Sequence, residues 1–150
     1  MNKIFKLNLK IAFLIFVFLD LICVGMGMGV PIFCILFGFL VGWYIVRRVI
    51  LQEENPKDIL KKSFKYAVTT SLFTFVVMAI LWGPSIKLFF TPGYDFKNFG
   101  IPLILYDPKI SFIGWLVLMI FISPFLQLLS TIFGVYLTLL KWFNKGSDNL

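Results

Sequence analysis

The apolar residues of this chain lie in long blocks, and the short segments between the blocks carry most of the charges. In a half-buried helix of a soluble protein, apolar residues would instead recur every three or four positions. The first block, residues 11–46, would extend about 54 Å as one helix, whereas the hydrocarbon core of a bilayer is about 30 Å thick. The pattern therefore predicts an all-α polytopic membrane protein whose first block crosses the bilayer twice.

The two crossings are separated by a run of helix-breaking residues, Gly25, Gly27, Gly29 and Pro31. Alternate glycines followed by a proline favour a tight turn, so we predict a helical hairpin with spans at 9–27 and 30–46. Glycine-rich runs also occur in phosphate-binding loops, but those loops follow a strand and open a soluble helix. Turn formation is therefore the predicted role of these glycines.

A polar segment, 47–65, separates this hairpin from the second one. Within it, Asn55, Pro56 and Asp58 are typical of a helix start, with an N-cap, a proline in the first turn and an early acidic residue. We expect this helix to continue into a third span, 66–82, that stops at Gly83-Pro84.

Residues 83–109, rich in proline and aromatic residues, are predicted to form an outer loop lying on the membrane surface. The fourth span is predicted within 111–140, a block that exceeds one crossing. It therefore requires a tilt, a kink at Pro124 or an extension into the cytoplasm. Two half-helices meeting at Ser123-Pro124 are the alternative. The four spans would form a single domain, 1–150, built as a bundle of two hairpins.

Basic residues predict the orientation, because cytoplasmic segments carry an excess of Lys and Arg. Three basic residues lie on one side of the predicted spans, Lys87, Lys97 and Lys109, and eleven lie on the other: Lys3, Lys6, Lys10, Arg47, Arg48, Lys57, Lys61, Lys62, Lys65, Lys141 and Lys145. Both termini and the 47–65 loop are therefore predicted to be cytoplasmic, and the protein to lie in the cell (inner) membrane. Cleavage of the first block as a signal peptide is an alternative, which Asp20 within that block disfavours.

Composition removes several classes of function. Charged residues make up 14% of the chain, against roughly 25% in an average soluble protein. The net charge of +7 follows from the membrane topology, so no nucleic-acid partner is expected. The sequence contains no histidine, the commonest catalytic base and metal ligand, and no recognised catalytic or nucleotide-binding motif. We therefore expect no enzyme activity, cofactor or metal site. Cys23 and Cys34 are read as inert thiols, with a disulfide across the hairpin as the alternative.

Asp20 is the one ionisable residue well inside a predicted span. An acidic residue at that depth costs about 2.5–3.5 kcal/mol, so it should face the bundle interior. Polar residues at similar depth complete a candidate intramembrane site: Asp20, Thr74, Gln127, Ser130 and Thr131. We expect Asp20 to hydrogen-bond to Gln127, Ser130 or Thr131. The carboxyl group would either couple a proton or cation to transport or serve as a hydrogen-bonded packing element.

Small residues predict where the helices pack. Cys34, Gly38 and Gly42 recur every four residues in the second span, and Gly134 lies on the polar face of the fourth. Such ridges let helix backbones approach closely. The expected function is that of a non-catalytic accessory subunit or scaffold of a membrane assembly. Its partners would be membrane lipids and other membrane subunits or further copies of the chain. A small oligomeric transporter that uses Asp20 is the alternative.

Overall fold

The computed structural model describes residues 8–25, 30–53, 55–99, 101 and 106–147. All regular structure in these ranges is helical. The first three long helices are α1 (Leu9–Val24), α2 (Val30–Ile50) and α3 (Pro56–Trp82), and α3 runs directly into the 3-10 helix η3 (Gly83–Phe90). After a short helix η4 (Phe96–Phe99), the last long helix comprises α4 (Pro108–Val117), a π-helical turn η5 (Leu118–Ile122) and α5 (Ser123–Ser147).

Three helical segments are long and apolar enough to cross a membrane: Val30–Ile50, Pro56–Phe90 and Pro108–Asn144. α1 has 16 residues, slightly fewer than the roughly 17–25 of a spanning helix. The helix of the predicted span 9–27 ends at Val24, and residues 26–29 lie outside the described ranges. The prediction of an all-helical protein with membrane-spanning helices is confirmed for three helical segments.

α3 begins where its sequence predicts. The Asn55 side chain accepts a hydrogen bond from the Lys57 backbone N–H at 3.2 Å, and Pro56 occupies the first turn. The polar segment and the third span therefore form one continuous helix. The α-helix ends at Trp82, as the stop at Gly83-Pro84 predicts, and the chain then continues as a 3-10 helix to Phe90. Pro84 has no N–H to continue the α-helical ladder, and 3-10 turns are common where such a ladder ends.

The last helix is not divided into two half-helices. It passes through Ser123-Pro124 with one widened turn, in which the Ser123 backbone N–H and its hydroxyl (2.8 Å) both donate to the Leu118 carbonyl. A π-helical turn is a common response to a proline that cannot donate to the preceding turn. The 37 residues of this segment extend about 55 Å, well beyond the thickness of the hydrocarbon core.

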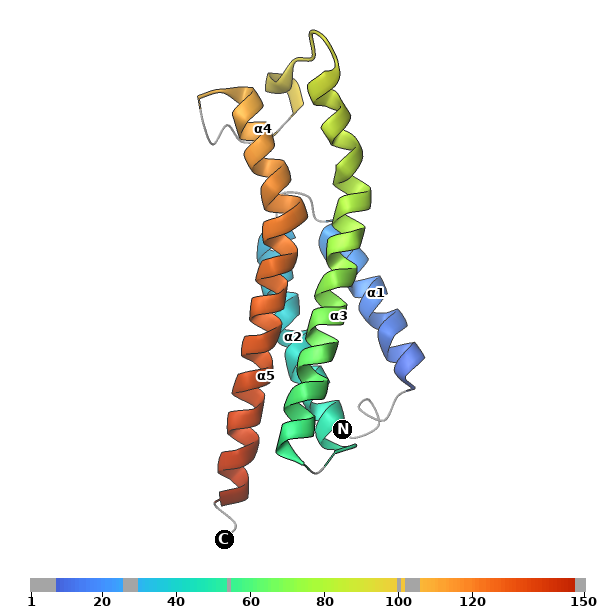
Figure 1. Ribbon diagram of the computed structural model, residues 1–150, viewed down its shortest axis with the longest axis vertical. Coiled ribbons are helices and arrows are strands. Elements are labelled where there is room, and N and C mark those ends of the chain that lie inside the picture. Colours follow the sequence, from blue (N-terminus) through green and yellow to red (C-terminus); the bar gives the residue numbers. More distant parts are fainter. Residues whose placement is uncertain (1–7, 26–29, 54, 100, 102–105, 148–150) are drawn as a thin grey trace.

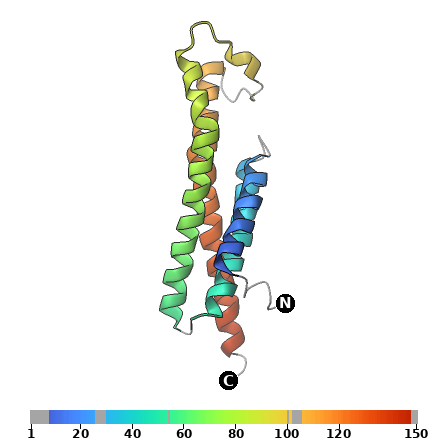
Figure 2. The ribbon, with the colours of Figure 1, turned by 90° about the vertical axis from the view of Figure 1, so that its right-hand side faces the viewer.

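The long helices lie side by side, and α1 leans away from them (Figure 1). α3 and the last helix extend beyond α1 and α2 at one end, which is clear when the molecule is turned (Figure 2). The opposite end, here called the basic end, carries most of the basic residues of the described helices: Lys10, Arg47, Arg48, Lys57, Lys61, Lys62, Lys65 and Lys141. There Lys62 and Glu53 form an ion pair, and this contact raises the pKa of Lys62.

Aromatic residues close the end opposite the basic end. The rings of Phe89 and Phe96 lie 5.1 and 5.3 Å from the Phe112 ring of α4. Trp82 and Trp115 meet edge to face at 4.4 Å between α3 and α4. Phe89 and Phe96 therefore find apolar partners within the protein, and the position of this loop on the membrane surface stays a prediction.

α2 packs most extensively on α5, and glycines set the distance between the two helices. A Cβ atom on Gly42 would lie 2.3 Å from the Thr131 carbonyl oxygen, and one on Gly38 would lie 2.6 Å from the Gln127 carbonyl oxygen. On the opposing helix, a Cβ on Gly134 would lie 2.9 Å from the Phe39 carbonyl oxygen. No side chain larger than hydrogen fits at these positions without separating the backbones.

The core has two apolar layers, one nearer the basic end and one nearer the aromatic end. The first contains Phe16, Phe37, Val41, Ile45, Val46, Val49, Ile59, Val135 and Leu139. The second contains Val24, Val30, Cys34, Met78, Phe112, Trp115, Leu116, Met119 and Ile120. Along α1, α3 and the last helix, most of the buried polar residues lie between these layers: Asp20, Ser71, Thr74, Ser123, Gln127, Ser130 and Thr131.

Replacement of Gly42 by alanine should destabilise the protein, because the added methyl group would meet backbone atoms of α5. Overpacking of this kind costs about 1–3 kcal/mol. Gly114→Ala is the matched control, since a Cβ there meets nothing within 4 Å. Thermal unfolding in detergent should show a lower midpoint for Gly42→Ala and an unchanged or higher one for Gly114→Ala. Equal midpoints for the two variants would contradict the close approach of α2 and α5.

Candidate intramembrane polar site

Asp20 is fully buried, with 0% of its surface exposed. Thr74 Oγ1 of α3 donates to Asp20 Oδ1 at 2.7 Å, and Gln127 Nε2 of α5 makes a longer contact with the same oxygen at 3.5 Å. One carboxylate oxygen on α1 therefore accepts hydrogen bonds from two other helices. The candidate site brings Asp20, Thr74 and Gln127 together.

Ser130 and Thr131 do not bond to Asp20, as the sequence had suggested they could. Their hydroxyl groups donate to the Gln127 carbonyl of their own helix, at 3.0 and 2.7 Å. This pattern is common for Ser and Thr within helices. Both residues pack against Gly38 of α2 instead, so their place is in the α2–α5 contact.

The shortest bond to Asp20 comes from Thr74, which sequence reasoning placed at the right depth but did not pair with the carboxyl group. Ser71, one helical turn before Thr74, was not among the predicted site residues. Its hydroxyl donates to the Pro124 carbonyl at 2.7 Å and joins α3 to α5. The small polar residues of α3 at this depth could have indicated the bonds of Ser71 and Thr74. The acceptor of the Ser71 bond is a backbone carbonyl, which the residue type does not predict.

The residues predicted to form the hairpin turn lie at the end of α1 and the start of α2. Gly25 ends α1, and its N–H donates to the Leu21 carbonyl at 2.9 Å. Pro31 is the second residue of α2. Gly27 and Gly29 lie outside the described residues. Cys23 and Cys34 are both free thiols, so the alternative of a disulfide across the hairpin is wrong.

Two buried polar atoms of the site have no hydrogen-bond partner among the described residues, Asp20 Oδ2 and Gln127 Oε1. Buried polar groups are nearly always hydrogen-bonded, so protonation of Asp20 would change the bonding of these atoms. A protonated Asp20 carboxyl group is a donor, and an amide that presents its oxygen is an acceptor. Within the described ranges, no group of three potential metal-ligating side chains (Cys, Asp or Glu) occurs at this site or elsewhere.

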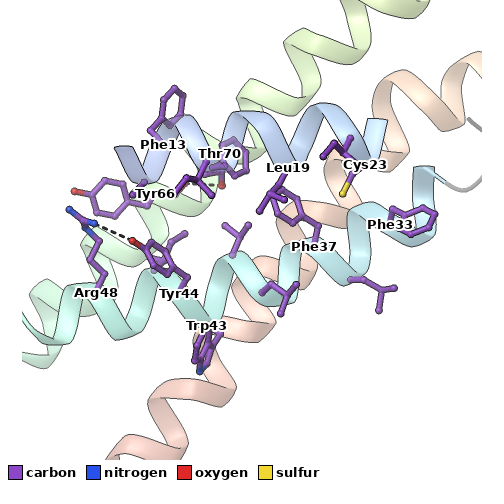
Figure 3. Close-up of a pocket in the computed structure, with 18 of the residues that line it drawn as sticks. Phe13, Leu19, Cys23, Phe33, Phe37, Trp43, Tyr44, Arg48, Tyr66 and Thr70 are labelled. Carbon is purple, nitrogen blue, oxygen red and sulfur yellow. Dashed lines mark hydrogen bonds between the residues drawn. The ribbon is translucent and has the colours of Figure 1, made fainter. Parts of the chain in front are cut away.

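A second feature lies between α1 and α2, where an open apolar groove of about 540 Å³ runs along both helices (Figure 3). Phe16 and Thr70 line it, whereas Asp20 does not. Asp20 is enclosed beneath the same face of α1 that carries Phe16 and Cys23, which do line the groove.

Comparison with protein families, with characterised proteins and with solved structures finds no match to this chain.

Thr74→Val should weaken the junction of α1 with α3, because valine keeps the shape of threonine but cannot donate to Asp20. Hydrogen bonds between membrane helices average about 0.6 kcal/mol and reach about 1.7 kcal/mol. Thr69→Val is the control, since Thr69 is exposed on the same helix and bonds only to the Lys65 carbonyl. Unfolding by a denaturing detergent should separate the two variants by about 1 kcal/mol. A Thr74→Val variant as stable as Thr69→Val would show that the bond to Asp20 is not stabilising.

Proposed function

We propose that this protein is a non-catalytic integral membrane protein that serves as an accessory subunit or scaffold of a membrane assembly. The observation that carries the proposal is the complete enclosure of its intramembrane polar residues. Asp20, Thr74, Gln127 and Thr131 each have 0% exposed surface. Their hydrogen bonds join α1, α3 and α5 of the same chain. Polar groups used in this way hold helices together.

We further propose four crossings of the cell's inner membrane, with both termini in the cytoplasm. The residues of α1 that face away from the bundle are large and apolar, including Leu14 (68% exposed) and Phe18 (62% exposed). A surface of this kind suits lipid and would be unfavourable in water. α1 with its adjoining turn then completes the first hairpin, and the concentration of Lys and Arg at the basic end supports the orientation.

The outward face of α3 is the surface best suited to a partner. Large apolar residues recur on it every four positions: Leu60, Phe64, Val68, Leu72, Val76 and Ile80. Little of α3 is buried within the chain, and it extends past α1 and α2 at the aromatic end (Figure 1). A neighbouring membrane helix could cover this stripe along its length.

Native mass spectrometry of the protein, extracted mildly from its own membrane, tests the proposal. We expect either a foreign membrane subunit in fixed stoichiometry or a defined oligomer of this chain. Val68→Lys should reduce that association, because it places a charge in the outward stripe of α3. Lys57→Gln, a change at the exposed start of the same helix, is the control. A chain recovered only as a monomer, under extraction that preserves other complexes, would contradict the proposal.

A small oligomeric transporter with Asp20 as its coupling residue is the second candidate. The unpartnered Asp20 Oδ2 and Gln127 Oε1 favour it, since a carboxyl oxygen without a fixed donor can exchange a proton. The two functions differ in what they require of Asp20. Packing requires a polar group of the same shape, whereas coupling requires a group that can ionise.

Asp20→Asn and Asp20→Leu separate these requirements. Asparagine still accepts the bond from Thr74, so stability should fall by less than about 1 kcal/mol, whereas leucine removes the acceptor of both interhelical bonds, leaves the Gln127 amide without Asp20 and should cost about 2 kcal/mol or more. In proteoliposomes, proton flux should be equally low for the wild type and Asp20→Asn. A flux present in the wild type and abolished in a stably folded Asp20→Asn variant would overturn the structural role in favour of transport.

A further inference from the structure

The groove between α1 and α2 exists because α1 leans away from α2 (Figure 1). Side chains from both helices line it, and Tyr66 and Thr70 of α3 close one side. The lining is almost wholly apolar, and the volume of about 540 Å³ falls within the ~300–1,000 Å³ of small-molecule sites. A groove of this composition suits a hydrocarbon chain.

One end of the groove carries a buried charge. Arg48 lines the groove and is only 8% exposed. Its Nη1 donates to the Tyr44 hydroxyl at 3.3 Å, and Figure 3 shows both side chains at the same end of the groove as Tyr66. No carboxylate of the described residues forms an ion pair with Arg48, since the ion pair found there joins Lys62 and Glu53.

A guanidinium group is always charged and has five N–H donors, of which the Tyr44 bond uses one. A buried charge without a counter-ion costs several kcal/mol. Phosphate is the anion whose geometry a guanidinium group matches best, through two parallel hydrogen bonds. The polar end of the groove therefore fits a phosphate group.

The apolar groove and the charged end at Arg48 have the same spacing as the acyl chain and the phosphate group of a phospholipid. Arg48 lies in the last turn of α2, close to Trp43 and Tyr44, which are residue types that favour the headgroup level. From Arg48 to Phe33, the groove follows α2 for about 22 Å, which exceeds the ~15 Å depth of one leaflet. An acyl chain can lie along the groove while its phosphate remains at Arg48.

We propose that the α1–α2 groove is a binding site for an anionic phospholipid of the leaflet at the basic end. Arg48 hydrogen-bonds the phosphate, and one acyl chain fills the apolar channel between α1 and α2. A second copy of the chain is the competing occupant of the groove, and crosslinking distinguishes it from a lipid.

The test measures the lipid that remains bound when the protein is released from nanodiscs of equal phosphatidylglycerol and phosphatidylcholine into native mass spectrometry. The wild type should retain phosphatidylglycerol in preference to phosphatidylcholine. Arg48→Gln should reduce this preference about tenfold or more, as expected for the loss of hydrogen bonds to a charged group. Arg47→Gln removes the same charge from an exposed neighbour and should leave the preference unchanged.

A second variant tests the groove with Arg48 intact. Ala12 lines the groove, so Ala12→Trp should displace the acyl chain and remove most of the bound phosphatidylglycerol. Val117→Trp, at an exposed position of α4 outside the groove, is the control and should retain the lipid. If Arg48→Gln does not fold, this pair and the preference of the wild type decide the question.

Four results would overturn the proposal. The first is a wild type without preference for phosphatidylglycerol. The second is an equal loss in Arg47→Gln and Arg48→Gln, which would indicate attraction by overall charge. The third is an Ala12→Trp variant that keeps its lipid. The fourth is a groove occupied by a second copy of the chain, which crosslinking between α1 and a neighbouring chain would detect.

Discussion

The backbones of α2 and α5 lie so close together that Gly38, Gly42 and Gly134 have no room for a Cβ atom. Between helices in lipid there is no hydrophobic driving force, because acyl chains are as apolar as leucine. Dispersion contacts and hydrogen bonds must supply the association, and close approach increases the number of atom pairs at optimal distance. The α2–α5 pair fixes the position of Gln127, whose side chain reaches Asp20. The rest of the bundle is arranged around this pair.

α1 is held by a different kind of contact. The hydrogen bond from Thr74 and the aromatic contacts of Phe13 and Phe16 with Phe73 connect it to α3. α1 also contacts α2 where Phe16 stacks on Phe37 at 5.5 Å, but it leans away from α2, and the groove follows from that lean. The bond between Thr74 and Asp20 holds α1 at one depth, while the rest of α1 packs loosely, so α1 is attached to the bundle without being surrounded by it. The enclosed polar site and the open groove are thus two results of one arrangement.

Much of this fold could be predicted from the sequence, because it depends on local signals. The Asn55-Pro56 start, the break after α1 and the small-residue ridge of α2 each follow from residue type and spacing. What failed depends on how helices rotate against one another. The depth of Thr74 could be counted from the basic end, but its direction toward Asp20 could not. Ser71 was missed because its acceptor is a backbone carbonyl. The lean of α1 and the burial of Arg48 also depend on packing that spacing alone does not determine.

The π-helical turn at Leu118–Ile122 has a consequence for the whole last helix. Buried positions recur every four residues along it: Phe112, Leu116, Ile120, Pro124 and Gln127, the last after a step of three. In a regular α-helix each step of four turns a side chain by about 40° away from the previous one, so the buried face would wind around the axis. The extra residue of the wider turn offsets part of this rotation. It keeps the aromatic end and the polar site in phase, facing the same neighbours. Removal of one residue there would therefore be absorbed by a return to regular α-helix, and Phe112 and Trp115 would still face α3.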